Sequence, residues 1–431
     1  MLETIFIYLI TAFFFVTLND MWGQLDFTYL LSRGEMYDFF FIIAVVVGGI
    51  LFLRRDQTIK ITKTIKFITA LLGGIVLYCV GNGIYCIVSE TQGILRTALV
   101  LREVLYLSVA ILFIVGNYDY KCALRLMTIL DCIGCFIAIV EIIVGPVSPL
   151  RVNGKYEIGV SYWRSYSDVP TLAFFLCPLL IYGLGAGKYL FGKWTDCMIL
   201  LLLVITKLLK MSRISIFSLL VVCAIAFIFC KGKEWRTIIR QVLWMTGMGV
   251  LGAGMIAMVT PELFIRFKDG IIGVLHLEGA SNSTAETMSY RWVTMQARWN
   301  YLCEHHRVFW GMGPLHNDLV IDLKDSYSWV NNGVVAPDIT YGAMLLRYGV
   351  AGMIVFIGNL LATAIIAWKN TNIVMKSFGL FILASLIEGL SSHSSLAFGA
   401  FLKIGILFGI AWKSISQEEQ NGEKISEGST H

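Results

Sequence analysis

Charged residues are scarce in this sequence, and their scarcity excludes most soluble fold classes. Asp, Glu, Lys and Arg make up 15% of the 431 residues, whereas hydrophobic residues make up 57% and the mean hydropathy is +0.74. Soluble domains carry about 25% charged residues. The composition therefore predicts a polytopic integral membrane protein in place of a soluble enzyme or binding module.

The sequence also lacks a combined cysteine and histidine cluster with the spacing of a zinc site. Most of its ten cysteines lie in apolar stretches, where cysteine is typically a small buried residue, and Cys303 lies in a long polar segment. His305 and His306 are adjacent and point apart on a helix, so we interpret them as surface residues. We expect no metal ion and no cofactor.

Two further absences concern the first residues and the symmetry of the chain. The first apolar run has no basic region before it and no small-residue cleavage site, which favours a retained helix over a signal peptide. No internal repeat is found in the sequence, although transporters are commonly built from repeated halves. The second absence argues against a transporter.

Apolar stretches of bilayer-spanning length recur along residues 1–413. They predict an all-α integral membrane domain of about 12 transmembrane helices. The predicted spans are 2–18, 36–53, 67–88, 98–116, 123–144, 169–187, 195–210, 212–230, 241–259, 339–366, 374–390 and 395–412. Residues 414–431 form a polar tail, for which we predict disorder.

The basic residues predict the orientation of these spans. They gather in short loops on one side, for example Arg54, Arg55, Lys60, Lys63 and Lys66, and again Lys231, Lys233, Arg236 and Arg240. The positive-inside rule then places both termini in the cytoplasm and leaves segments 145–168 and 260–337 outside. The longer segment has more acidic than basic residues, so non-specific attraction to nucleic acid does not explain it.

The external segment 260–337 is expected to contain short amphipathic helices. Residues 262–277 mix apolar and basic side chains in a way that suits a helix lying at the membrane surface. Residues 281–284, of sequence SNST, supply N-cap side chains for a second helix. This helix would place one apolar face inward, made of Trp292, Met295, Trp299 and Leu302.

Arginines gather at the predicted external side of the membrane. They are Arg164, Arg213, Arg266, Arg291, Arg298 and Arg347, with Arg151 beside them in the first external segment. The planar guanidinium group suits phosphate oxygens, so these residues favour a pyrophosphate ligand over a neutral solute. Ion pairs within the protein, or contact with lipid headgroups, explain any single arginine equally well.

Other polar residues in this region are candidates for proton transfer or sugar binding. Asp338 follows a proline at the mouth of an apolar helix, where it either caps the helix or orients an attacking hydroxyl group. His316 is a second candidate base, and Tyr341 lies one turn into the helix. Trp299 suits either a sugar face or the membrane boundary. The turn Gly311-Met312-Gly313 has backbone N–H groups that suit a phosphate.

Several runs, taken in order, resemble one known family. They are the pair Ser212-Arg213 opening an apolar span, then RWVTMQARW at 291–299, VFWGMGP at 308–314, and DITYGAMLLRYGVAG at 338–352. With the multi-span scaffold and the long external segment, they resemble the bacterial O-antigen and capsule polymerase family, which is related to the O-antigen ligases. In the ligases a His-Asn pair is expected where Asp338 stands, and this departure favours a polymerase.

The resemblance implies a reaction and its partners. A glycan carried on undecaprenyl pyrophosphate would be transferred to a sugar hydroxyl of another lipid-linked repeat unit, and the polyprenyl pyrophosphate would leave. Arg213, Arg291 and Arg347 are implied to contact the pyrophosphate or glycan, with Asp338 aligning the hydroxyl group. The implied location is the bacterial inner membrane, with a flippase and a chain-length regulator as possible partners.

Two other functions stay open from the sequence. A glycan ligase would move a finished chain to a different acceptor, and a transporter or flippase would carry the lipid-linked oligosaccharide across the membrane. A non-catalytic membrane subunit is a third hypothesis. Retained activity after Asp338→Asn and Arg291→Ala would favour the non-catalytic subunit.

Overall fold

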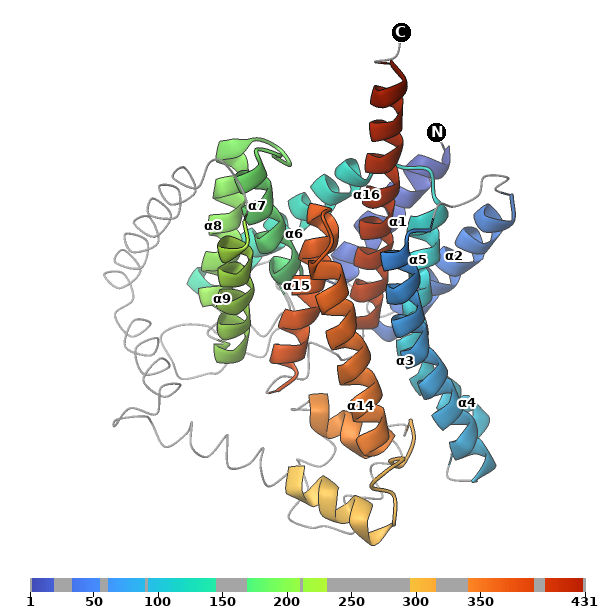
Figure 1. Cartoon of the computed structure of the whole chain (residues 1–431). Helices are drawn as coiled ribbons and strands as arrows, with labels where there is room; N and C mark the ends of the chain where they lie inside the picture. Colours follow the sequence, from blue (N-terminus) through green and yellow to red (C-terminus); the bar gives the residue numbers. More distant parts are fainter. Residues whose placement is uncertain are drawn as a thin grey trace, which may run out of the picture.

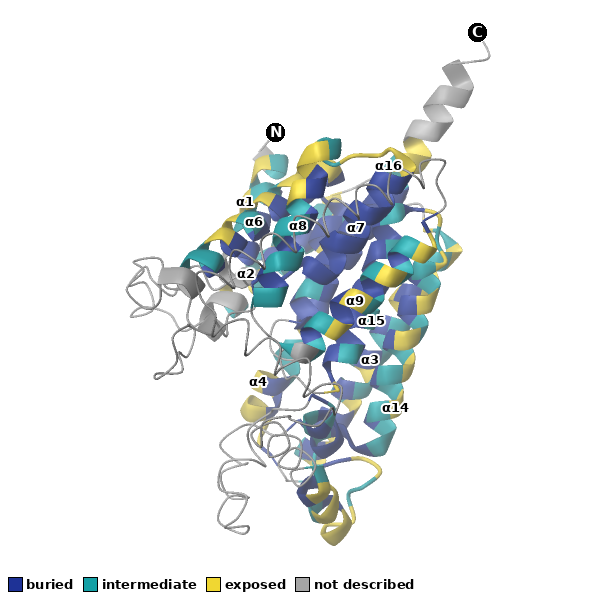
Figure 2. Ribbon diagram, turned by 90° about the vertical axis from the view of Figure 1, so that its left-hand side faces the viewer, coloured by how far each residue is buried: buried dark blue, intermediate teal, exposed yellow. Residues whose placement is uncertain are grey.

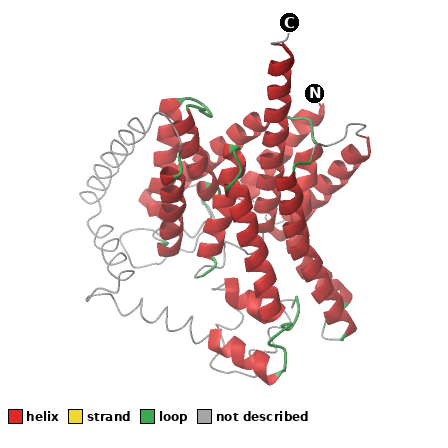
Figure 3. Cartoon of the chain, viewed as in Figure 1, coloured by secondary structure: helices red, strands yellow, loops and turns green. Residues whose placement is uncertain are grey.

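The computed structural model describes most of the chain. The described residues are 2–18, 33–54, 61–89, 92–144, 169–209, 212–230, 295–314, 340–390 and 400–428. In this part of the chain the regular secondary structure is helical, and no strand occurs (Figure 3). The predicted all-α class is therefore confirmed for the described residues.

The helices keep the labels of Figure 1. Their bounds are α1 Leu2–Leu18, α2 Arg33–Arg54, α3 Lys63–Val88, α4 Ile94–Leu105, η2 Tyr106–Val109, α5 Ala110–Val115, α6 Tyr120–Val144, α7 Ala173–Ala186, α8 Lys193–Leu209, α9 Arg213–Ile228, α14 Thr340–Trp368, α15 Ile373–Glu388 and α16 Ala400–Gly428. A further helix covers residues 295–304.

Helices occur in each predicted span that the structure describes, while 241–259 lies outside the described residues. Among the described residues, four helices are long and apolar enough to cross a membrane: Lys63–Val88, Ile94–Val115, Tyr120–Val140 and Thr340–Trp368. Several shorter apolar helices accompany them. The chain is thus a helical protein with candidate membrane spans.

Helices α14 and α15 form the middle of the bundle (Figure 1). Helix α14 packs against α15 and α3, while α15 also packs against α7, α9 and α16. All residues of α7 from Ala173 to Gly185 are buried, and Figure 2 draws them in dark blue. The start of α1 and the end of α16 lie at one end of the bundle, and residues 295–314 lie at the opposite end (Figure 1). We call this opposite end the loop end.

Two ionisable side chains inside the bundle form hydrogen bonds with backbone groups of neighbouring segments. Asp131 of α6 accepts hydrogen bonds from the backbone N–H groups of Thr171 and Leu172, at 2.9 and 3.3 Å, just before α7. The Nζ of Lys413 donates to the carbonyl oxygen of Gly116 at 2.7 Å. These bonds offset the cost of burying the two charges and explain both residues without a catalytic role.

The prediction of a disordered tail from Ser414 is wrong, because α16 continues to Gly428. Ser414 and Ile415 are still buried in the bundle. One turn later Gln417 donates to the carbonyl oxygen of Tyr118 at 2.7 Å, and Glu418 accepts from Asn372 at 2.9 Å. The polar composition of this segment therefore did not indicate a helix, although its first polar turn is hydrogen-bonded to the bundle.

Tyr118 supplies a test of packing in the turn between α5 and α6. It is buried, and its hydroxyl group has no hydrogen-bond partner within the described residues. Tyr118→Phe should therefore leave the protein equally stable or stabilise it by about 1 kcal/mol near neutral pH. Thermal unfolding in detergent measures this change. A destabilisation of more than about 2 kcal/mol would show that the hydroxyl group has a bonded role.

The same substitution should change the alkaline limit of stability. Burial raises the pKa of Tyr118 well above its usual value of 10.0. The folded state therefore keeps the neutral phenol while the unfolded chain ionises, so stability present below pH about 10 is lost as the pH rises further. Tyr118→Phe should reduce that loss, measured as a smaller fall in Tm between pH 9 and 11 than in the wild type.

Candidate functional site at the loop end

Helix α14 is broken at Gly349, near the loop end. Gly349 has φ 64° and ψ −169°, a backbone conformation that is essentially restricted to glycine. In an unbroken helix the N–H groups of Val350 and Ala351 would donate to the carbonyls of Leu346 and Arg347. The break leaves these four backbone groups in need of other partners.

Residues 308–313, which we call the interlock segment, supply those partners. Val350 N–H donates to the carbonyl of Val308 at 3.0 Å, and Ala351 N–H donates to the carbonyl of Phe309 at 3.1 Å. In the other direction, the N–H groups of Met312 and Gly313 donate to the carbonyls of Leu346 and Arg347 at 2.9 and 2.7 Å. The sequence runs VFWGMGP and RYGVAG are thus joined by backbone hydrogen bonds.

The glycines of the interlock segment allow this close approach. Gly311 and Gly313 both have positive φ, 74° and 93°. A Cβ atom on Gly311 would lie within 3.0 Å of backbone atoms of Arg347 and Gly349. The N–H of Gly311 donates to the carbonyl of Arg307 at 2.7 Å. Because the N–H groups from 311 to 313 are all bonded within the chain, the expectation that this turn binds phosphate is wrong.

Polar side chains of α3 and of the following turn bond to the interlock segment and to Pro314, which follows it. Asn82 donates to the carbonyl of Trp310 at 2.9 Å, and Gln92 donates to the carbonyl of Pro314 at the same distance. The hydroxyl group of Tyr78 donates to the carbonyl of Tyr348, at 2.9 Å, within the broken turn itself. Helices α3 and α14 are thereby held together around the break.

An ion pair lies directly beside the break. Arg347 of α14 approaches Glu103 of α4, with 3.6 Å between Nη1 and Oε2, and the two side chains are 28% and 25% exposed. Within the described chain neither side chain makes a hydrogen bond. Glu103 lies about 14 Å along α4 from Ile94, and Arg347 lies about 10 Å along α14 from Thr340. Both residues lie within candidate membrane-spanning helices, where a charge is costly and typical of functional sites.

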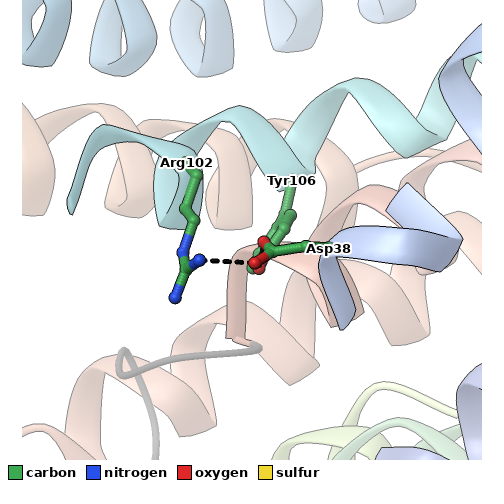
Figure 4. A network of polar contacts seen from close by, with 3 residues as sticks. All are labelled: Asp38, Arg102 and Tyr106. Atoms are coloured by element: carbon green, nitrogen blue, oxygen red, sulfur yellow. Dashed lines mark hydrogen bonds and ion pairs between the residues drawn. The ribbon is translucent and has the colours of Figure 1, made fainter. Parts of the chain in front are cut away.

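A second ion pair on the same helix has a different environment (Figure 4). Arg102 of α4 pairs with Oδ2 of Asp38 on α2, and the hydroxyl group of Tyr106 donates to Oδ1 of the same carboxylate at 2.6 Å. Both carboxylate oxygens of Asp38 are therefore engaged. We interpret this network as a structural link between α2 and α4, in contrast with the loosely paired Glu103.

The predicted residues of helix 295–304 face in different directions. Arg298 is only 1% exposed, and its guanidinium group lies against Gly342 of α14. Trp299 is 42% exposed. Leu302 is buried against Leu345 and Leu346. The apolar face predicted for this helix is therefore right for Leu302 and wrong for Trp299, because Arg298 lies at the packed surface in its place.

Helices α9, α14 and α15 meet at the loop end as well. Arg213 is the first residue of α9, and Ser215 in the same turn donates to the buried carboxylate of Glu388 on α15. The hydroxyl group of Tyr341 on α14 donates to the carbonyl of Leu386 on α15. The structure thus brings the beginnings of α9 and α14 to the last turn of α15, while the role of Tyr341 in substrate binding stays a prediction.

Half of the predicted site lies outside the described residues. This half comprises Arg164, Arg266, Arg291, His316 and Asp338, and the side chain of Arg213 lies outside as well. Sequence reasoning missed Glu103, Asp38 and Arg102. The signal that identifies all three is an ionisable residue within a predicted apolar span, 36–53 or 98–116.

Comparisons with known proteins assign no role to these residues. A scan against protein-family models finds no match to the chain, and a search of curated proteins finds none either.

Proposed function

We propose that this chain is a membrane glycosyltransferase that polymerises oligosaccharide repeat units carried on polyprenyl pyrophosphate. The observation that supports the proposal is the pair Arg347 and Glu103. It places a cation and a carboxylate side by side in candidate membrane-spanning helices, with no hydrogen bond to either side chain within the described chain. A lipid-linked pyrophosphate is an amphipathic anion, and its charge suits a guanidinium group in a helix of this kind.

The chemistry of the pair suits the proposed substrate. The guanidinium group has five N–H donors in a planar fork, and its ion pair with Glu103 uses only part of that fork. The remaining donors can bind phosphate oxygens and stabilise the negative charge that develops on the departing pyrophosphate. The break at Gly349 fixes the backbone of Arg347, because its carbonyl accepts from Gly313 at 2.7 Å.

The other predicted residues complete the proposal. Arg213 and Arg298 would add positive charge at the loop end, Arg291 would contact the glycan or pyrophosphate, and Asp338 would orient the acceptor hydroxyl group. No metal ion enters the proposed reaction, because arginines take the place that a divalent cation holds in other phosphate-transferring sites. Both the donor and the acceptor would be lipid-linked repeat units.

The gene deletion tests this proposal in the host. We expect the deletion strain to accumulate single repeat units on the carrier lipid, and complementation with the wild-type gene to restore the ladder of polymers on gels. Arg213→Ala, Arg291→Ala and Asp338→Asn should each reduce the ladder by roughly tenfold or more at normal membrane levels.

Each alternative function predicts a different phenotype of the deletion strain. Full-length polymer that stays on the carrier lipid and never reaches its acceptor would identify a ligase. Single repeat units trapped on the cytoplasmic leaflet would identify a flippase. A normal ladder in all three variants would show that the protein acts without these residues and would contradict the catalytic assignment.

A further inference from the structure

Glu103 differs from the other carboxylates of the bundle at the loop end. Asp38 accepts from both Arg102 and Tyr106, and Glu388 accepts from Ser215. Among the described residues Glu103 has one ion-pair contact, to Arg347 at 3.6 Å, which is longer than a hydrogen bond. Its side chain is 25% exposed, and that of Arg347 is 28% exposed.

The neighbour of Glu103 determines which ligand fits. A carboxylate accepts hydrogen bonds, so it binds a group that donates, such as a sugar hydroxyl. The guanidinium group of Arg347 donates only, so it binds an anion. A ligand that spans the two groups therefore presents a hydroxyl group next to a phosphate oxygen, which is the arrangement found where an acceptor sugar meets a pyrophosphate-linked donor.

We propose that Glu103 is the residue that accepts the proton of the acceptor hydroxyl group during glycosyl transfer, an inference that rests on the function proposed above. The acceptor oxygen forms a bond to the anomeric carbon of the donor. The bond between that carbon and the pyrophosphate oxygen breaks, and the pyrophosphate leaves with the bonding electron pair. The proton of the hydroxyl group moves to Glu103, which later releases it to water.

The positions of the two helices support this role. Glu103 is held by α4, which packs against α3. Arg347 is held by the broken turn of α14, which is bonded to α3 through Tyr78 and to the interlock segment. Both groups thus stand on segments fixed by packing and hydrogen bonds, as the alignment of reacting groups requires. The role assigned to Asp338 by the sequence would then be binding or helix capping.

Kinetics of the purified full-length protein in lipid nanodiscs test the inference. The substrate is the repeat unit of the host on polyprenyl pyrophosphate, and the product is the dimer of repeat units. Glu103→Gln should lower kcat by roughly 10²–10⁴-fold, the usual contribution of a general base, and change KM by less than about threefold. Glu103→Asp should keep an intermediate kcat, because it retains the carboxylate at a longer distance.

Glu418→Gln is the matched control. Glu418 lies on α16 at the opposite end of the bundle and accepts hydrogen bonds from Asn372 and Tyr120. Glutamine can accept the first through its amide oxygen and donate to the hydroxyl oxygen of Tyr120 through its amide N–H group. The kcat of this variant should equal that of the wild type. If Glu103→Gln does not fold, Glu103→Asp decides: a wild-type kcat at a wild-type Tm overturns the inference, and a lower kcat at that Tm supports it.

The outcomes separate the role of Glu103 from the proposed function. A wild-type protein that forms no dimer from the lipid-linked substrate refutes the polymerase function and the role of Glu103 with it. An active wild type with an equally active Glu103→Gln variant refutes the role of Glu103 alone. A lower kcat in Asp338→Asn with a normal kcat in Glu103→Gln would assign the general base to Asp338. This result would also refute the role of Glu103 alone.

Discussion

Replacing Gly349 with alanine should destabilise the loop end and abolish the polymer formation proposed above. A non-glycine residue at φ 64° and ψ −169° costs on the order of 1–3 kcal/mol in backbone strain alone. The added Cβ atom would also lie within 3.0 Å of backbone atoms of Phe309 and Gly311. Relief of this contact separates the interlock segment from α14 and breaks their four backbone hydrogen bonds.

Gly358→Ala is the control for this substitution. Gly358 lies on the same helix, and a Cβ atom there would meet nothing within 4 Å. Alanine at this position should be neutral or stabilising by about 0.5–1 kcal/mol. Thermal unfolding in detergent and the polymer ladder are measured for both variants. A Tm for Gly349→Ala equal to that for Gly358→Ala would contradict the broken-helix geometry.

Charge reversal at the ion pair should separate its contribution to stability from the catalytic role proposed for it. Arg347→Glu places two carboxylates side by side, and Glu103→Arg places two guanidinium groups there. Breaking a fully buried pair costs about 3–5 kcal/mol, and this pair is about a quarter exposed, so we expect about 1–3 kcal/mol for each single reversal. Membrane levels of both single variants should therefore fall, and their polymer ladders should be lost.

The double variant Glu103→Arg with Arg347→Glu restores opposite charges at the same two positions. Its free energy of unfolding should exceed that of either single variant by about 1–2 kcal/mol, and the coupling energy of the pair follows from the full double-mutant cycle with the wild type. The ladder should stay absent, because the cation and the carboxylate have exchanged places relative to the substrate. A double variant that makes normal polymer would show that the pair stabilises the fold and has no part in the chemistry.

The helices were predictable from the sequence to within a few residues. Spans 2–18 and 67–88 correspond to α1, Leu2–Leu18, and α3, Lys63–Val88. A long apolar run in a membrane protein forms a helix because a helix satisfies its backbone N–H and C=O groups within the segment. The end of α16 was not predictable in this way. Its polar residues carry no apolar signal, and the bonds of Gln417 and Glu418 join groups far apart in the sequence.

The site was predictable only in part, for a related physical reason. Arg347 was identified by its charge within an apolar span, whereas its partner Glu103 lies in a different span, and a sequence does not show which spans pack together. The motif VFWGMGP was identified as a turn with free N–H groups. A glycine within an apolar run does not by itself indicate that the helix is broken there. The carbonyl groups of α14 that accept hydrogen bonds from those N–H groups could therefore not be predicted.

The joint between the interlock segment and α14 consists mainly of backbone groups, and this has an evolutionary consequence. Hydrogen bonds between N–H and C=O groups are indifferent to most side chains, so Val308, Phe309 and Met312 can be exchanged without loss of the bonds that they make. Only the glycines at 311, 313 and 349 are constrained by their positive φ. Distant homologues should therefore retain this architecture with three spaced glycines as almost the whole of their shared sequence.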